Sequence, residues 1–210
     1  WILHKFNELT KDVTDNLDKF EIGLALQKVY DFIYDSFCDW YIELVKPRLY
    51  EGGDTATKAL SVLVTVFTET LKMLHPFMPF ITEEIWQSMP VSDESIMIAP
   101  FPKYDEALCF EAECIKLENI MESITAIRNR RAEMNVPMSK KAKLYIIPRT
   151  KGSFDGSEMF YIKLAGANEV IFDICNDENA VKIVTPAADL YIPFEDLVNL
   201  DEERARLQKE

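Results

Sequence analysis

Histidine, cysteine and glycine are scarce in this chain of 210 residues, which contains two, four and six of them. The cysteines are scattered and none forms a C-x-x-C pair, so they match neither a zinc site nor a dense disulfide framework. No glycine-rich loop is present to cradle a nucleotide, and no Ser-His-Asp or Cys-His pairing suggests itself. We therefore expect reduced cysteines in a cytoplasmic protein, and neither a catalytic site nor a cofactor or metal site in these residues.

Long apolar runs and an excess of positive charge are also missing. No stretch of about 18 apolar residues would span a bilayer, so no membrane association is expected. The chain has 36 acidic and 23 basic residues, a formal net charge of −13, and an evenly acidic surface would repel nucleic acid. The charge is uneven, however, because residues 128–151 contain eight basic residues and one acid. The total therefore does not exclude a polyanion that docks on this basic segment.

Residues 1–137 are predicted to form an antiparallel α-helical bundle. Apolar residues recur at intervals of three and four, as helices require, over residues 1–17, 20–45, 59–74 and 105–134. Pro47 and then Gly52-Gly53 are expected to end the second helix. Pro79 is placed to open a further short helix that runs through Trp86.

The pattern changes after Pro137, where strand-like segments replace the helical spacing. Residues 138–199 are predicted to form a small α+β domain with strands near 143–147, 169–174, 181–184 and 190–192, and a helix over 157–164. Leu200 and Leu207 are seven apart, which indicates that residues 200–210 begin a coiled-coil arm. The predicted fold class is mainly α. Because Trp1 lies inside an amphipathic pattern, the chain is expected to be a piece of a longer protein.

Two arginines fall where the apolar stripe of the last helix should continue. With 100° per residue and Ile124 at the centre of the stripe, Arg128 and Arg131 lie inside it. Burying them unpaired would be costly. Two alternatives stay open: the helix end contacts nucleic acid, or the arginines pair with bundle acids such as Glu43, Glu83 or Glu84.

Aromatic side chains in the bundle present a similar choice. Stacking on unpaired bases is one use of such side chains in RNA recognition, but helical spacing favours a core role for Trp1, Trp40, Tyr41 and Trp86. The adjacent acids Glu83 and Glu84 do not face one target on a helix. They favour matching of the helix dipole over acid/base chemistry.

Two motifs resemble a known family. Residues 75–86, HPFMPFITEEIW, resemble the helix-breaking motif in the anticodon-binding domain of class I aminoacyl-tRNA synthetases of the valine, isoleucine and leucine group. Residues 128–137, RNRRAEMNVP, followed by Ser139-Lys140-Lys141, resemble the valine branch, valine–tRNA ligase, in particular. The opening WIL and the closing DEERARL resemble the bundle entry and the coiled-coil arm of that branch, so the resemblance covers essentially the whole chain.

The resemblance implies that the full-length protein uses ATP, with Mg²⁺, to join valine to its tRNA through a valyl-adenylate. It also implies that catalytic and editing domains lie upstream in the same chain, which is expected to act as a monomer. The present residues contain neither an H-I-G-H nor a K-M-S-K-S sequence. This fragment alone is therefore predicted to be inactive and to hold no cofactor.

For these residues the resemblance implies binding of the tRNA anticodon stem and loop. The predicted RNA-binding residues are Arg128, Asn129, Arg130, Arg131, Lys140, Lys141 and Lys143. The basic side chains would contact phosphates without reading sequence, and Asn129 would contact a base edge. An isoleucine or leucine synthetase fragment would have the same bundle. A helical protein-interaction module would explain the acidic bundle but not the basic segment.

Overall fold

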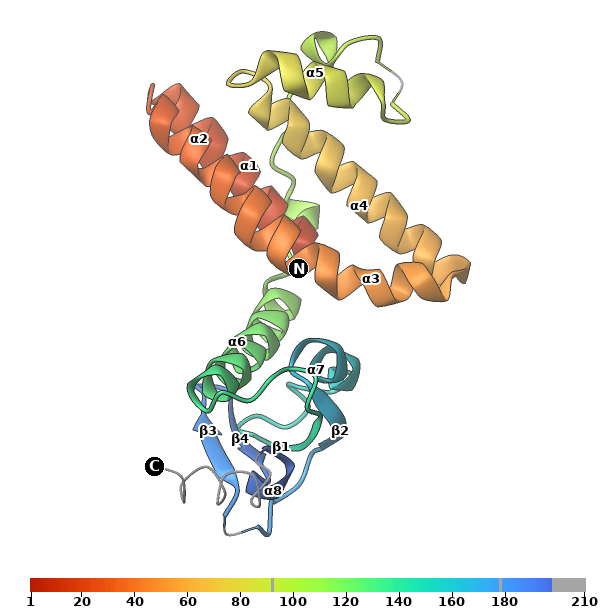
Figure 1. The fold of residues 1–210 in the computed structure, drawn as a ribbon. Coiled ribbons are helices and arrows are strands. Elements are labelled where there is room, and N and C mark those ends of the chain that lie inside the picture. The colour runs from red at the N-terminus through yellow and green to blue at the C-terminus, as the bar shows by residue number, and fades with distance from the viewer. Residues whose placement is uncertain (92, 178, 198–210) are drawn as a thin grey trace, which may run out of the picture. The chain divides into compact units, whose positions relative to one another are not determined.

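The computed structural model describes residues 1–91, 93–177 and 179–197 (Figure 1). They divide into two compact units, Trp1–Cys114 and the residues from Ile115 onward. The regular elements described in the first unit are all helices, and the second unit contains a four-stranded sheet. The predicted mainly α fold, a bundle followed by a small α+β part, is confirmed. The predicted coiled coil at 200–210 lies outside the described residues.

Helices α1 (Ile2–Asp18) and α2 (Ile22–Asp31) form a hairpin with a tight turn between them (Figure 1). Four apolar residues of α1 that follow the predicted spacing are buried, namely Ile2, Phe6, Leu9 and Val13, and Leu17 is partly buried. They pack against buried residues of α2 such as Ala25 and Val29. Removing this apolar surface from water, about 25 cal/mol per Å², is what stabilises the hairpin.

The helix predicted over residues 20–45 is not α-helical throughout. After α2 the chain forms a π-helical segment, η1 (Phe32–Tyr41), and then α3 (Ile42–Glu51). Phe32 and Phe37 are five residues apart and both are buried. Because a π-helical turn bonds residues five apart, it places this pair on the same side of the helix. The wider π-helical turn therefore accommodates the spacing of these two phenylalanines.

Pro47 lies inside α3, and the prediction that it contributes to ending this helix was wrong. A proline lacks the N–H that would bond the carbonyl four residues earlier, so the helix continues with one hydrogen bond fewer. The predicted end at Gly52-Gly53 is confirmed, since α3 stops at Glu51. Gly52 has φ of 75°, a conformation that glycine adopts without steric cost.

Helix α4 (Gly53–Leu74) returns along α3 and also contacts α1 and α2 (Figure 1). It begins at Gly53, ahead of the apolar pattern that the sequence shows over residues 59–74. Its second half is buried through residues such as Val66 and Met73, whereas Leu60 in its first half is 50% exposed. Helix α4 is therefore buried mainly through its second half.

Helix α5 (Pro79–Gln87) begins with proline in its first turn, as predicted. Its Trp86 is buried against Leu71 of α4 and Ile96 of the short helix η2 (Ile96–Ile98). The indole N–H donates to the main-chain carbonyl of Asp93 at 3.2 Å. The motif at residues 75–86 therefore builds a small core at one end of α4.

Helix α6 (Glu111–Glu133) starts later than predicted, because a short 3₁₀ turn, η3 (Glu106–Leu108), precedes it. Most of α6 belongs to the second unit, so the division of the chain falls after Cys114 and not after Pro137 as the sequence suggested. The physical reason is a buried contact with α7 (Glu158–Leu164). The hydroxyls of Ser123 and Tyr161 are 2.5 Å apart.

The sheet has the strand order β2-β1-β4-β3. Its strands are β1 (Ala142–Pro148), β2 (Ala167–Ile171), β3 (Val181–Val184) and β4 (Ala188–Ile192), followed by a short helix α8 (Phe194–Leu197). Helix α7 connects β1 to β2, which run parallel, whereas β4 is antiparallel to both β1 and β3. Alternate residues such as Leu144, Ile146 and Leu190 are buried. The four predicted strands are confirmed, although β2 begins and ends earlier than the predicted range of 169–174.

Candidate nucleic-acid interface

The basic segment starts on the last turns of α6 and passes through a tight turn into β1. Asn135 has φ of 53°, and the amides of Asn135 and Val136 donate to the carbonyls of Ala132 and Arg131 at 3.0 and 2.8 Å. This pair of bonds is the Schellman arrangement that closes many helices. Asparagine tolerates the left-handed conformation better than most residues. The main chain is therefore fixed immediately after the arginines of α6.

Arg131 is buried in the second unit and only 1% exposed. Its Nη2 donates to the main-chain carbonyl of Pro137 at 3.0 Å and to that of Lys140. Burial lowers the pKa of the guanidinium. Among the described residues, no carboxylate forms an ion pair with it. The prediction that Arg131 contacts phosphate is therefore corrected, because interior carbonyls hold this side chain.

The other predicted residues lie nearer the surface. The exposed ones are Arg128, Asn129, Arg130, Lys141 and Lys143, and Lys140 is half-buried. Arg130 forms an ion pair with Glu133 at 3.0 Å. Lys143 pairs with Glu169 of β2 at 3.3 Å, and the hydrogen bond to that carboxylate raises the pKa of the lysine. These two cations are already partly neutralised, whereas no ion pair to Lys141 is found within the described part of the chain.

Arg128 links α6 to the end of α7. Its Nε donates to the main-chain carbonyl of Leu164 at 2.6 Å. The sequence placed Arg128 inside the apolar stripe, but the side chain reaches the surface while its Nε bonds α7. Residues 128–130 and the loop with Lys140 and Lys141 thus lie at the same end of α6, because the side chain of Arg131 donates hydrogen bonds to that loop.

The far end of the basic segment has a different role. Arg149 donates from Nη2 to the carboxylate of Asp189 on β4 at 3.0 Å and to the carbonyl of Thr185 at 3.3 Å. Its charge is therefore offset within the sheet. The basic segment of the sequence is not one continuous cationic surface.

The aromatic residues weighed as stacking candidates belong mainly to the core. Trp86 is 2% exposed, and Trp1 and Tyr41 pack against the buried residues of the bundle. Burial also raises the pKa of Tyr41. The core interpretation is confirmed for these three residues.

Phe20 is an exposed aromatic residue whose position the sequence did not reveal. It lies in the turn between α1 and α2, is 87% exposed and has φ of 61°. The amides of Phe20 and Glu21 donate to the carbonyls of Leu17 and Asn16 at 3.0 and 2.8 Å, so the Schellman arrangement also closes α1. A bulky residue with positive φ is a strained outlier, and such strain is concentrated at functional sites. The apolar periodicity had assigned Phe20 to the next helix.

Glu83 organises the loop after α5 and shows no arrangement for acid/base chemistry. Its carboxylate accepts hydrogen bonds from the side chain of Gln87 at 2.6 Å, the hydroxyl of Ser95 at 2.9 Å and the amide of Ile96 at 3.2 Å. These bonds, led by that of Gln87, lower the pKa of Glu83. The acid therefore remains ionised and fixes the connection to η2.

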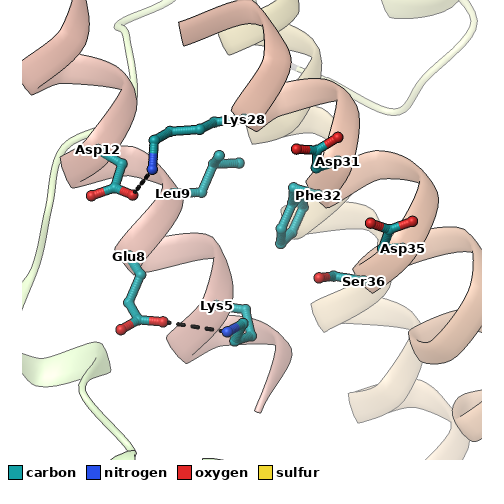
Figure 2. A pocket seen from close by; sticks show the side chains of 9 residues that line it. All are labelled: Lys5, Glu8, Leu9, Asp12, Lys28, Asp31, Phe32, Asp35 and Ser36. Carbon is teal, nitrogen blue, oxygen red and sulfur yellow. Dashed lines mark hydrogen bonds and ion pairs between the residues drawn. The ribbon is translucent and has the colours of Figure 1, made fainter. Parts of the chain in front are cut away.

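A cavity of about 230 Å³ lies between α1 and the helix that starts with α2 (Figure 2). Its lining residues are Lys5, Glu8, Leu9, Asp12, Lys28, Asp31, Phe32, Asp35 and Ser36. Figure 2 shows Lys5 beside Glu8 and Lys28 bonded to Asp12. Acidic residues outnumber basic ones, so the cavity repels phosphate. No cluster of metal-ligating side chains is found among the described residues.

Comparison with known families identifies the class. Residues 1–146 match the model of the anticodon-binding domain of tRNA ligases. The match covers the bundle, α6 and most of β1, including the basic end of α6. The chain therefore belongs to the family of anticodon-binding domains of tRNA ligases.

Individual relatives carry one specific name. The chain is 48% identical to the valine–tRNA ligases of Clostridium acetobutylicum and Clostridium perfringens and 40% identical to that of Bacillus cereus. Each alignment covers the whole of this chain and 24% of the relative. The chain thus spans about a quarter of the length of these curated relatives. Among the described helices, none is both long and apolar enough to cross a membrane.

Proposed function

We propose that this chain is the part of a valine–tRNA ligase that binds the anticodon stem and loop of the valine tRNA. The observation that carries the proposal is the family match over residues 1–146, together with relatives of that name along the whole chain. These relatives favour the valine enzyme over the isoleucine and leucine alternatives. The exposed basic side chains at the end of α6 are consistent with an RNA ligand.

The proposal extends to the full-length protein. There we assign the ATP-dependent attachment of valine to tRNA, with ATP and Mg²⁺ bound by catalytic residues outside the present 210. We further propose that the catalytic and editing domains belong to the same polypeptide, and that it acts as a cytoplasmic monomer. The role of the present chain is then to select the tRNA.

Phosphate contacts are assigned to the exposed cations at the end of α6 and on β1. Lys141 is expected to contribute most. Arg130 must first break its ion pair with Glu133, and Lys143 its ion pair with Glu169, before either binds a phosphate. Such contacts position the RNA without reading its sequence. Asn129 is exposed on the same turns, and its amide is able both to donate to and to accept from a base edge.

Base stacking is assigned to Phe20. Unpaired bases stack on exposed aromatic rings, and one such contact contributes about 1–3 kcal/mol. The ring of Phe20 is 87% exposed although its backbone is strained. A residue that only packed the turn would be better replaced by glycine or asparagine. The strain is therefore consistent with selection for a ligand.

The test is a titration of this chain with two tRNA transcripts, one with a valine anticodon and one with that anticodon replaced. We expect tighter binding of the first and a fall of log K with log salt concentration, since phosphate contacts release counterions. Lys141→Ala should weaken both complexes severalfold and reduce the salt slope by about 0.7–0.9. Lys58→Ala is the matched control, because Lys58 is an exposed cation of α4 far along the chain from the basic segment.

The two transcripts separate the parts of the proposal. Equal affinity for both would contradict anticodon readout by this chain. An absence of binding to either at low salt would contradict the tRNA ligand altogether. Equal effects of Lys141→Ala and Lys58→Ala would instead contradict the assignment of the phosphate contacts to the end of α6.

A further inference from the structure

One buried side chain holds together both sides of the turn that follows α6. The main-chain carbonyl of Arg131 accepts from the amide of Val136 at 2.8 Å. Its side-chain Nη2 donates to the carbonyl of Pro137 at 3.0 Å and to that of Lys140. The same residue therefore closes the helix and fixes the loop that carries Lys140 and Lys141.

The position of Arg131 is unusual for a cation. It is 1% exposed, its Nε has no hydrogen-bond partner in the described structure, and no carboxylate there neutralises it. Its charge is offset by two carbonyl dipoles and by the partial negative charge at the end of α6, where the residue lies in the last turn. A buried polar group satisfied only in part is costly. An apolar residue would fill this space at less cost if packing were the only requirement.

Gly166 completes the arrangement from the other side. It has φ of 73°, and a Cβ added to it would lie 3.3 Å from Cζ of Arg131 and 3.3 Å from the carbonyl oxygen of Met138. Both distances are tighter than ordinary contacts. A side chain at position 166 would therefore push the guanidinium away from the loop. The planar guanidinium fits a narrow space between main-chain segments in a way that a flexible lysine does not.

We propose that Arg131, placed against Gly166, is a positioning residue for the phosphate-binding surface, which rests on the tRNA-binding function proposed above. It does not touch RNA. It fixes the loop with Lys140 and Lys141 against the last turns of α6, where Asn129 and Arg130 are exposed. The spacing of the cations is thus set before RNA arrives, which removes the cost of ordering the loop during binding.

The first test is a double-mutant cycle on tRNA affinity in this chain, measured well below the unfolding transition of every variant. Arg131→Met is combined with the pair Lys140→Ala and Lys141→Ala. Alone, Arg131→Met should weaken binding about five- to tenfold and lower the salt slope, because two cations lose their place. In the background without the loop lysines it should have almost no further effect.

The second test keeps the proposal falsifiable if Arg131→Met does not fold. Gly166→Ala is compared with Gly156→Ala, since both glycines have positive φ, of 73° and 77°, but a Cβ on Gly156 meets nothing within 4 Å. Backbone strain is thus matched. We expect Gly166→Ala to weaken tRNA binding severalfold and to speed amide exchange at Lys140, and Gly156→Ala to do neither.

The outcomes distinguish this inference from the function on which it rests. If the unmodified chain does not bind tRNA, the proposed function fails. If it binds but Arg131→Met weakens binding equally with and without the loop lysines, Arg131 acts on folding or on RNA directly and the positioning role is overturned. Equal binding by the Gly166→Ala and Gly156→Ala variants would overturn it as well.

Discussion

Helices α1 and α6 end in the same hydrogen-bond arrangement, but different residues occupy its left-handed position. Asn135 closes α6, and Phe20 closes α1. The end of α6 is also fixed from within by Arg131, whereas the turn at Phe20 presents an 87% exposed ring. One helix end is therefore stabilised by a residue suited to its backbone, and the other retains a residue that is not.

Under the proposed function, the two helix ends present their binding groups in different ways. Cations are mobile on long side chains, so a phosphate-binding loop gains from a rigid main chain. An aromatic ring has few torsions and needs only to project from the surface. The surrounding charge follows the same division, since residues 1–114 contain 9 basic and 20 acidic residues and residues 115–210 contain 14 and 16. Phosphate contacts therefore suit the second unit, and stacking suits the first.

The largest expected effect comes from placing the wrong charge at the end of α6. Arg131→Glu should lower the free energy of unfolding by more than about 3 kcal/mol, because it buries a carboxylate against two carbonyls. Arg130→Glu, one residue away and exposed, should cost less than about 1 kcal/mol. Urea titrations followed by circular dichroism measure both. Similar losses would show that Arg131 is not buried in solution.

A smaller loss of stability is expected when the contact between α6 and α7 is weakened at Tyr161, away from the last turn of α6. Burial raises the pKa of Tyr161, whose hydroxyl meets that of Ser123. The folded state therefore favours the neutral phenol, and its contribution is complete below the unfolded pKa of about 10. Above that pH, stability should fall by up to about 1.4 kcal/mol per pH unit until the folded pKa is reached.

Tyr161→Phe should remove this part of the alkaline loss and cost about 1 kcal/mol at neutral pH, since one buried hydrogen bond is lost. Tyr50→Phe is the control, because that ring is 85% exposed. The measurement is the urea midpoint at pH 7 and between pH 10 and 11. An unchanged alkaline loss in Tyr161→Phe would contradict the buried phenol.

The smallest and most direct change exchanges the residues at the two helix ends. Phe20→Asn should raise the free energy of unfolding by up to about 1 kcal/mol, because asparagine is less strained at positive φ. Asn135→Phe should lower it by a similar amount. Thermal unfolding measures both, and the comparison is contradicted if the two changes have the same sign. If Phe20 stacks on a base, the stabilised Phe20→Asn variant should nevertheless bind tRNA more weakly.

Periodicity predicted most of the fold, because burial of apolar residues decides it. The spacing of Ile2, Phe6, Leu9 and Val13 identified α1, and alternating residues identified the strands of the sheet. The same pattern did not locate the division between the units. The apolar spacing of α6 does not say which unit the helix packs on, whereas the bonds from Ser123 to Tyr161 and from Arg128 to Leu164 show that it packs on α7.

The candidate site was predicted only in part. A cluster of cations is visible in the sequence, and the spacing also showed that Arg131 falls on the buried side of its helix. What it could not show is that main-chain carbonyls 6 and 9 residues away satisfy the guanidinium. Phe20 was missed for a related reason. Its backbone conformation depends on how α1 meets α2, and the position holds none of the residue types, such as glycine or asparagine, that predict a left-handed turn.

The place of β1 between β2 and β4 in the sheet also has a consequence for folding order. Strand β1 is central, and its antiparallel partner β4 follows far along the chain, with Tyr145 opposite Tyr191. During synthesis β1 therefore emerges from the ribosome long before its second neighbour exists. In the first unit, α1 contacts α2 and α3 contacts α4, and such contacts between successive helices form early. We expect the loop at Lys140 and Lys141 to become ordered last, after β4 has paired with β1.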